Sequence, residues 1–369
     1  MLRKSKIILK QVLKNINEFI KNKKFVNEVK NVCTKSLNFD RNITFDKIEY
    51  IEIENLKKFK YVGAINYKNY VYFIPNSVNK FLKLNIDDYK YEFIDFNVKE
   101  EEFLWTGGGV YNNKLYCFPR KSNKILILNL ENDNVELYDL NIDYQEEHHY
   151  GGVLTEDGIV YMPPRNNDNI LKINLNDLSC SKIKISPKFL KYRYISGKIN
   201  SNGLIYFLPE ENEKVMVFNP INEKVKFIGC RLDAMVYDVA LYNNNLYGFS
   251  GYKDGLLKID TNLEKTSMIF QDIKNPGSYG TKVALNGLFY NIPGYGDKIY
   301  EFNPENEEIN ELYEFSNNLE LKCAGGCLAQ DGNIYCAPAN GSKIIVIKFR
   351  NIKNINNEII KFVNFFDNY

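Results

Sequence analysis

Two stretches of the sequence decide the fold: GGVLTEDGIVYMPP at residues 151–164 and GGCLAQDGNIYCAP at residues 325–338. Each begins with a glycine pair, passes through an Asp-Gly dipeptide, and continues into an apolar segment that carries a tyrosine and ends on proline. Asp-Gly between two apolar runs is a strong signal for a β-hairpin turn. Each stretch therefore predicts two adjacent antiparallel strands, and their likeness predicts a repeat.

The tyrosine of this motif recurs seven times at intervals of 41–45 residues, as Tyr72, Tyr116, Tyr161, Tyr206, Tyr247, Tyr290 and Tyr335. In six units proline follows the tyrosine by three residues, as Pro75, Pro119, Pro164, Pro209, Pro293 and Pro338. In six units Asn or Asp follows it by thirteen residues, as Asn85, Asn129, Asn174, Asn219, Asp260 and Asn303. Glycines precede it in every unit but the fifth, as Gly63, Gly108, Gly151, Gly197, Gly280 and Gly325. Landmarks that share one phase predict seven copies of a single unit.

Each unit contains four short strand-like segments separated by turn signals, among them LYCFP at residues 115–119 and KILILNL at residues 124–130. A period of 41–45 residues with four strands is typical of a propeller blade. Closing such blades into a ring removes the sheet edges that each would otherwise expose. We therefore predict an all-β fold, a seven-bladed β-propeller of four-stranded blades, with a short helical N-terminal segment. An open array of hairpins is the alternative.

The repeat resembles those of the broad class of Kelch-, WD40- and NHL-like propellers over roughly residues 46–350, through the pattern GG-V-x4-G-x-I-Y-x-x-P. It differs from a Kelch repeat, which has a tryptophan in each blade, because Trp105 is the single tryptophan of this chain. It also lacks the Trp-Asp ending of a WD40 blade. The resemblance therefore implies a fold and no particular activity.

Composition narrows the class of protein further. The 369 residues are 44% hydrophobic and 25% charged, with a net charge of +2, which is ordinary for a globular protein. The first 30 residues hold nine Lys or Arg against two Glu, a local charge of +7 that leaves −5 for the remainder. We therefore expect no nucleic-acid partner for the propeller. Seven scattered cysteines, no membrane-length apolar run and no signal-peptide pattern lead us to expect a cytoplasmic protein with reduced thiols.

We divide the chain into a basic amphipathic helical segment (1–45), the propeller (46–352) and a C-terminal tail (353–369). In the first segment Ile8, Val12, Ile16 and Ile20 share one face of the predicted helix. This helix either docks on the propeller or binds a partner or a membrane surface, and we expect a membrane contact through this segment alone.

Two segments could close the ring. KIEYIEI at residues 47–53 alternates like a strand and is in phase with the outermost strand of a blade. EIIKFVNFF at residues 358–366 could supply the same strand from the other end of the chain. We favour the N-terminal segment because of its phase.

Functional residues in propellers typically lie on loops that the rigid blades hold in place. The loops that lead into the first strands and those that follow the second strands share one face of the ring. In units two to five they supply our candidate ligand-binding residues: Trp105, Arg120, His148, His149, Tyr150, Arg165, Arg193, Tyr194, Tyr237 and Asp238. Arginines beside aromatic rings suit an anionic or sugar-like ligand, through bidentate contacts and stacking. The alternative is a polar rim whose arginines only cover apolar surface.

Other chemistry finds little support in the residues. His148 and His149 are the only histidines, and neighbours on a strand point to opposite faces, so we expect no shared metal. A propeller enzyme resembling the streptogramin lyases would need histidines dispersed over several blades together with a glutamate, a pattern from which this sequence departs. Cys323, Cys327 and Cys336 have no visible fourth ligand, and we interpret them as buried thiols. We expect no metal, no cofactor and no catalytic residue.

Two functions from different classes remain open. The first, which we favour, is a non-catalytic binding module that recognises a peptide, glycan or protein partner on one face of the ring. The second is a lyase or hydrolase that acts on a small ligand at the channel mouth.

Overall fold

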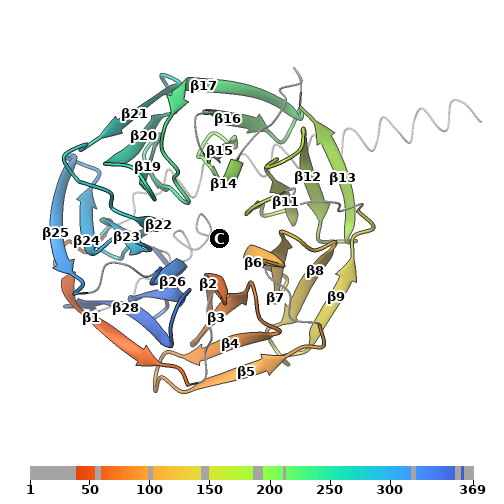
Figure 1. Cartoon of the computed structure of the whole chain (residues 1–369), viewed down its shortest axis with the longest axis horizontal. Helices are drawn as coiled ribbons and strands as arrows, with labels where there is room; N and C mark the ends of the chain where they lie inside the picture. The colour runs from red at the N-terminus through yellow and green to blue at the C-terminus, as the bar shows by residue number, and fades with distance from the viewer. Residues whose placement is uncertain are drawn as a thin grey trace, which may run out of the picture.

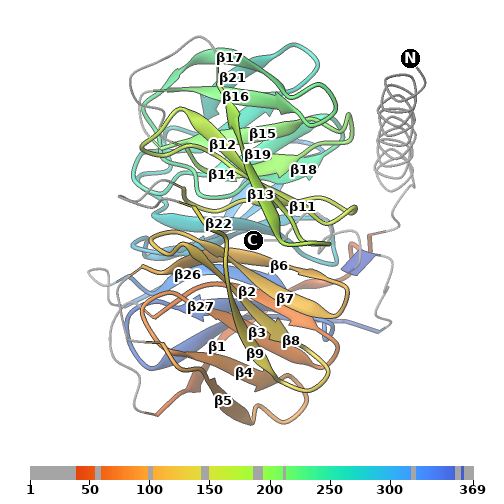
Figure 2. The same cartoon turned by 90° about the vertical axis from the view of Figure 1, so that its right-hand side faces the viewer.

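The computed structural model describes residues 39–54, 60–98, 103–142, 149–185, 194–210, 213–316, 321–353 and 359–360. These residues form seven four-stranded antiparallel sheets arranged as blades around a central axis (Figure 1). Seen edge-on in Figure 2, the outer strands β9 and β13 of two neighbouring blades face the viewer. The prediction of a seven-bladed β-propeller is confirmed, whereas the predicted N-terminal helix lies outside the described residues.

Six blades take their strands in chain order from the axis outward. Blades 1 to 3 are β2 (Tyr61–Tyr67), β3 (Tyr70–Pro75), β4 (Lys80–Asn85) and β5 (Tyr91–Asp95); β6 (Trp105–Tyr111), β7 (Lys114–Pro119), β8 (Lys124–Asn129) and β9 (Val135–Asp139); and β10 (Val153–Leu154), β11 (Ile159–Met162), β12 (Asn169–Asn174) and β13 (Ser179–Lys184). Blades 4 to 6 are β14 (Tyr194–Ile199), β15 (Ile205–Pro209), β16 (Glu213–Asn219) and β17 (Lys224–Leu232); β18 (Ala240–Tyr242), β19 (Asn245–Phe249), β20 (Leu256–Asp260) and β21 (Lys265–Ile269); and β22 (Ser278–Val283), β23 (Phe289–Pro293), β24 (Lys298–Asn303) and β25 (Glu308–Glu314).

Blade 7 is assembled from both ends of the chain. Its inner strands are β26 (Cys323–Leu328), β27 (Ile334–Pro338) and β28 (Lys343–Arg350), and its outermost strand is β1 (Thr44–Glu52). Strand β1 pairs antiparallel with β28, from Thr44 opposite Arg350 to Glu52 opposite Lys343. The N-terminal strand therefore closes the ring, as the phase of residues 47–53 predicted.

The repeated landmarks have structural causes. The seven tyrosines all lie in the second strand of their blade and are buried between neighbouring sheets. The Asn or Asp thirteen residues later ends the third strand, where its side-chain oxygen accepts a hydrogen bond from the backbone N–H two residues on. This bond is 2.9 Å at Asn85, Asn129 and Asn219, and 3.0 Å at Asp260. An Asx turn of this kind shapes the connection to the fourth strand.

The glycines mark a bulge in the innermost strand. In blade 1 Tyr61 pairs with Pro75 and Ala64 with Phe73, so the first strand holds one extra residue. Gly63 supplies it with a φ of 97°, a left-handed conformation that favours glycine. Blade 7 repeats the arrangement with Gly325 at a φ of 84°. A Cβ on Gly325 would lie 3.1 Å from the Cα of Gly63, so these glycines also let blades 7 and 1 approach closely at the axis.

Ion pairs tie successive blades together near their outer strands. Lys83 of blade 1 lies 2.6 Å from Asp133 of blade 2, and Lys172 of blade 3 lies 2.7 Å from Glu223 of blade 4. Both acids occupy the same place in their Asx turn, four residues after the asparagine, with positive φ. The turn between the third and fourth strands of one blade thus positions the acid that contacts the preceding blade.

Two further findings concern the described residues as a whole. Their cysteines are all free thiols. No helix among them has the length and apolar character needed to cross a membrane.

Candidate functional site

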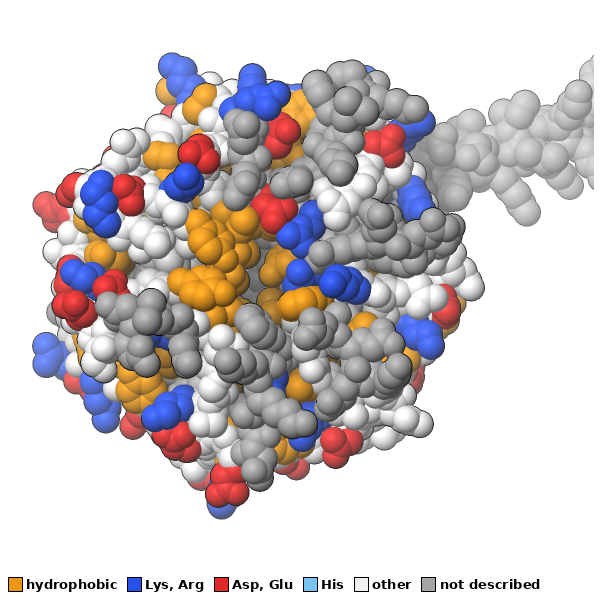
Figure 3. Space-filling model, in the orientation of Figure 1, with side chains coloured by type: hydrophobic (Ala, Val, Ile, Leu, Met, Phe, Trp, Pro, Cys, Tyr) orange, Lys and Arg blue, Asp and Glu red, His pale blue; other side chains and the backbone are white. Residues whose placement is uncertain are grey.

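The innermost strands surround a channel along the ring axis, and on one face the channel opens into a hollow of about 160 Å³. We call this hollow the channel mouth. Figure 3 looks onto this face, where hydrophobic and tyrosine side chains surround the centre with basic and acidic side chains beside them. All seven blades line the mouth, represented in order by Val62, Arg120, Tyr150, Glu210, Tyr237, Tyr279 and Ala324.

One side of the mouth is a stack of cations and rings. The guanidinium of Arg120 lies 4.5 Å from the ring centre of Tyr150, and that of Arg165 lies 5.1 Å from the same ring. Arg120 also covers Phe103 at 4.4 Å. Phe103 has a φ of 63°, which a bulky residue rarely adopts, and such strained backbone tends to occur at functional sites. The two arginines that the sequence pairs by blade symmetry therefore converge on one tyrosine.

Arg165 is further oriented by Glu210 from blade 4. Its Nη2 lies 2.7 Å from Oε1 of Glu210, and its Nε donates a hydrogen bond of 3.1 Å to Oε2. Both side chains are largely buried, with 18% and 14% of their surface exposed. This bidentate geometry is the strong form of an arginine–carboxylate contact. The carboxylate of Glu210 thus holds the guanidinium group of Arg165 in place at the mouth.

The other side of the mouth is a wall of tyrosines from blades 5 and 6. The rings of Tyr237 and Tyr279 are stacked, with centres 4.0 Å apart and planes within 18°. The hydroxyl groups of Tyr252 and Tyr279 are hydrogen bonded at 2.9 Å, and Tyr295 packs edge-on against Tyr279 at 6.0 Å. Burial raises the pKa of Tyr237 and Tyr279, so both hydroxyl groups keep their protons at neutral pH. The wall offers aromatic faces and neutral hydroxyl groups to a ligand.

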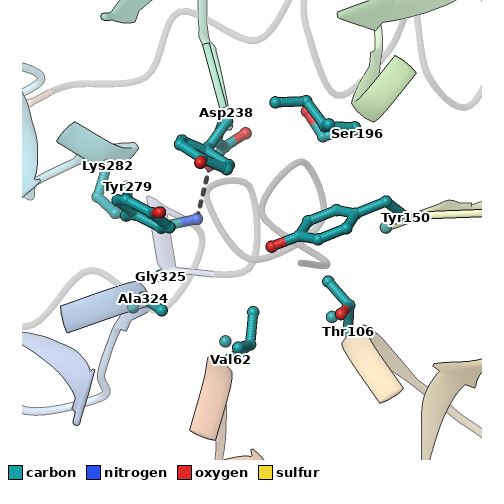
Figure 4. Close-up of a pocket in the computed structure, with 15 residues that line it drawn as sticks. Val62, Thr106, Tyr150, Ser196, Asp238, Tyr279, Lys282, Ala324 and Gly325 are labelled. Carbon is teal, nitrogen blue, oxygen red and sulfur yellow. Dashed lines mark hydrogen bonds and ion pairs between the residues drawn. The ribbon is translucent and has the colours of Figure 1, made fainter. Parts of the chain in front are cut away.

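Below the mouth the channel narrows to a second hollow of about 50 Å³, which we call the inner pocket (Figure 4). Besides three tyrosines, its polar lining residues are Thr106, Ser196, Asp238 and Lys282. Tyr150 and Tyr279 line both hollows, so the two are continuous. In Figure 4 the Tyr150 ring points inward across the channel, and the ammonium of Lys282 reaches Asp238.

Five of the predicted residues line the mouth or the inner pocket. One of them is Tyr150, which lines both hollows. Arg120 and Arg165 line the mouth, Tyr237 lines both hollows, and Asp238 lines the inner pocket. Ligand binding by these residues stays a prediction, but the geometry brings them together around one space.

Three other predicted residues lie between the sheets, away from the channel. The indole N–H of Trp105 donates to the carbonyl oxygen of Lys124 at 2.9 Å. The hydroxyl of Tyr194 donates to the carbonyl oxygen of Lys214 at 2.8 Å, and His149 is buried with Nδ1 2.9 Å from the carbonyl oxygen of Pro163. The cause is strand alternation, because each of these side chains points away from the axis and its successor in the chain points toward it. Those successors are Thr106, Tyr150 and Ile195. The two remaining predicted residues, His148 and Arg193, lie outside the described residues.

Sequence reasoning missed two lysines. Lys198 and Lys282 hold equivalent positions in β14 and β22, eight residues before the blade tyrosine, and both are almost fully buried. A lysine within the buried innermost strand of a blade was the available signal, since lysine is almost never buried without a charged partner.

The described residues contain no cluster of side chains that could form a metal site. No group of three or more His, Cys, Asp or Glu side chains is arranged there to hold a metal ion. Cys323 and Cys336 are buried, and burial followed by the neighbouring Cys323 thiol raises the pKa of Cys336. Both behave as small core side chains.

The sequence matches no known protein family and no curated protein. The fold does match solved structures. A streptogramin B lyase superposes with a TM-score of 0.68 over 82% of this chain and 98% of its own, at 15% identity. Virginiamycin B lyase from Staphylococcus aureus gives a TM-score of 0.68 over 81% and 98%, at 14% identity. The WD40 repeats of RRP9 give 0.61 over 82% and 100%, at 9% identity. At these identities the similarity establishes the propeller fold, which both a lyase and WD40 repeats share.

Proposed function

We propose that this propeller is a binding module whose channel mouth holds a small anionic ligand that also carries a ring, such as an acidic sugar. The observation that carries the proposal is the stack of Arg120, Tyr150 and Arg165 on one side of an axial hollow that has tyrosines on the other side. Binding sites of a rigid scaffold are expected where its loops converge. At the channel mouth, residues from all seven blades converge.

The residue chemistry favours this class of ligand for two reasons. Guanidinium groups bind carboxylates and phosphates bidentately, and Arg120 and Arg165 supply two of them within reach of one ring. Tyrosine faces stack on planar or sugar rings while the hydroxyl groups form hydrogen bonds at little entropic cost. A cation on one side and an aromatic wall on the other therefore recognise two different parts of the same molecule.

Binding without catalysis is the better supported of the two functions. His149 uses its Nδ1 on a backbone carbonyl and does not line either hollow. The described lining residues hold two acidic side chains, Glu210 and Asp238, and each is engaged by basic side chains in an ion pair. A general acid or base needs to reach the substrate, and charge pairing of this kind leaves these carboxylates serving as structural counter-ions.

The experiment is a ligand screen by isothermal titration calorimetry with acidic monosaccharides, acidic peptides and sugar phosphates. Wild type is compared with the Arg120→Ala, Arg165→Ala double variant. The matched control is Lys265→Ala, which also removes a positive charge, because Lys265 is exposed on the outer strand β21. We expect the double variant to lose affinity by about a hundredfold, since each lost charge-assisted hydrogen bond typically contributes about tenfold or more. Binding that survives in the double variant as strongly as in the Lys265 control would place the site elsewhere.

A further inference from the structure

The seven innermost strands share one position at the level of the inner pocket, two residues before the residue that pairs with the blade tyrosine. In chain order its occupants are Gly63, Gly107, Gly151, Ser196, Asp238, Gly280 and Gly325. All but Gly280 line the inner pocket. Five glycines add no side chain to this ring of positions, so Ser196 and Asp238 determine the chemistry that it offers (Figure 4).

Asp238 is already engaged by the protein itself. Its carboxylate accepts hydrogen bonds from the ammonium groups of Lys198 at 3.0 Å and Lys282 at 2.8 Å. The backbone N–H of Val239 donates a third bond to it at 2.8 Å. Opposite charges that contact each other inside the protein give no reason to expect an ion as the ligand of the pocket. The hydroxyl of Ser196 is therefore the group of this ring that is open to a ligand.

Ser196 is buried without a hydrogen-bond partner. It is 2% exposed, and its Oγ has no partner among the residues that the structure describes. Two other buried serines are paired: Oγ of Ser250 accepts from the N–H of Lys253 at 3.0 Å, and that of Ser278 donates to the carbonyl oxygen of Gly280 at 2.6 Å. Most buried hydroxyl groups are paired in this way, because an unpaired one destabilises the folded state. The exception at Ser196 lies on the wall of a cavity, where a ligand can complete it.

The size and the walls of the pocket restrict the group that can reach Ser196. A volume of about 50 Å³ holds about three or four water-sized atoms. Val62, Ile195 and Ala324 line both the pocket and the mouth, so aliphatic groups surround much of the passage between them. Burying an ion in such surroundings is costly, whereas a neutral hydroxyl loses little once it is hydrogen bonded. A hydroxymethyl group meets both restrictions.

We propose that the inner pocket is a hydroxyl subsite, in which Ser196 binds the hydroxymethyl arm of the acidic sugar at the mouth. The inference rests on the proposed function, in which Arg120 and Arg165 bind the acid group and the tyrosines contact the ring. It narrows the ligand class to acidic sugars that carry a neutral hydroxyl on a one-carbon arm, because the arm has to pass Tyr150 to reach Ser196. The acid group and the arm then bind in different hollows.

The first measurement is thermal unfolding of the free protein, because removal of an unpaired hydroxyl and of a paired one has opposite effects. Ser196→Ala should raise the melting temperature by about 1 °C or more, since it removes a buried polar group without a partner. The matched control is Ser278→Ala, the same change at a buried serine that is hydrogen bonded and lines neither hollow. The control should lower the melting temperature. A fall or no change on Ser196→Ala overturns the proposal, because the hydroxyl would then be satisfied in the free protein.

The second measurement is titration calorimetry with glucose 1-phosphate and 6-deoxyglucose 1-phosphate, which differ in one hydroxyl on the arm. We expect wild type to bind glucose 1-phosphate about tenfold more tightly, since a site built to bond a hydroxyl discriminates against an analogue that lacks it. Ser196→Ala should bind the two sugars with similar affinity. Ser278→Ala should keep the wild-type preference.

Failure of the subsite can be distinguished from failure of the proposed function. Three results overturn the subsite: no binding of glucose 1-phosphate to wild type, equal affinity of wild type for both sugars, or an undiminished preference in Ser196→Ala. The mouth proposal is judged by whether the acidic ligands of the screen lose affinity in the Arg120→Ala, Arg165→Ala double variant. If they do while Ser196→Ala keeps the preference, the subsite fails and the mouth proposal stands. If they do not while Ser196→Ala abolishes the preference, the mouth proposal fails and the hydroxyl subsite stands.

Discussion

Arg350 donates a hydrogen bond of 3.1 Å from Nε to Oγ1 of Thr44, which lies 306 residues earlier in the chain. The bond sits at one end of the β1–β28 ladder, the only place where the first described strand meets the last. Ile43, Ile51 and Ile53, on or beside β1, are buried in the core. Ring closure in this protein is therefore a contact between the two ends of the described chain.

Deleting residues 1–54 should accordingly destabilise the whole ring. Without β1 the ladder groups of β28 become an unpaired edge, which favours aggregation. We expect the truncated protein to lose cooperative thermal unfolding and to aggregate, as measured by calorimetry and size-exclusion chromatography. Deleting residues 1–38 keeps β1 and serves as the control. Equal melting of the 1–54 deletion and the full chain would contradict the closure seen here.

The blade tyrosines should contribute to stability through their hydroxyl groups where these are buried and paired. Tyr290 donates to Glu301 and accepts from Nδ2 of Asn286 at 2.9 Å. Asn286 also donates to the carbonyl oxygen of Ile43, so Tyr290 supports the residue that anchors the start of β1. Tyr290→Phe should lower the free energy of unfolding by about 1 to 2 kcal/mol, because it leaves these partners unsatisfied. Urea denaturation measures this, with exposed Tyr138→Phe on β9 as the control that should change nothing.

Asp238 should be the most sensitive position in the channel. Asp238→Asn leaves the ammonium groups of Lys198 and Lys282 facing each other without their carboxylate. Removing one partner of a buried charge cluster typically costs about 3 to 5 kcal/mol. We expect a loss of this size in urea denaturation at pH 7. Asp272→Asn, in an exposed turn, should be neutral.

The same carboxylate predicts a pH dependence with a definite sign. The pKa of Asp238 is lowered from its ordinary value of 3.8 in the folded protein, so the unfolded chain binds its proton more tightly. Its stabilisation is therefore present above about pH 4 and is lost as the pH falls toward the lowered value. The stability gap between wild type and Asp238→Asn should narrow between pH 7 and pH 3. A gap that stays constant over this range would mean that the carboxylate charge is not what stabilises the ring.

Much of the fold was predictable because each landmark has a local cause. The blade tyrosine, the strand-ending proline and the Asx-turn asparagine each act within their own repeat, so their spacing reports the blade directly. Closure was harder to predict, because residues 47–53 pair with a strand that lies at the far end of the sequence. Only the phase of the repeat connects the two segments.

The candidate site was predictable at the level of loops and less so at the level of side chains. Arg120 and Arg165 follow directly from blade symmetry. The orientation of Trp105 could not be predicted in this way. Trp105 and Thr106 are neighbours on one strand, so only one of them can face the axis, and in the structure it is Thr106. The bulge at Gly107 then adds a residue, so counting alternate positions along the strand fails beyond it. Lys198 and Lys282 come from blades 4 and 6, and nothing local in either repeat connects them with Asp238 of blade 5.

The ion pair between Arg165 and Glu210 leads to the last prediction, which distinguishes an acidic ligand from a neutral one. An anion that binds Arg165 has to share or displace the carboxylate of Glu210, which holds both Nε and Nη2. Glu210→Gln keeps the size of the side chain and removes the competing charge, so it should raise the affinity for an acidic ligand by about three- to tenfold, within the usual range of a single charged contact at a partly exposed site. It should also steepen the salt dependence of binding, because one more positive charge is uncompensated. Titration calorimetry at two salt concentrations measures both effects, with Glu264→Gln on the outer turn of blade 5 as the control. A loss of affinity on Glu210→Gln would instead mean that Glu210 accepts hydrogen bonds from the ligand, as it would from the hydroxyl groups of an uncharged sugar, and the anionic class would then be wrong.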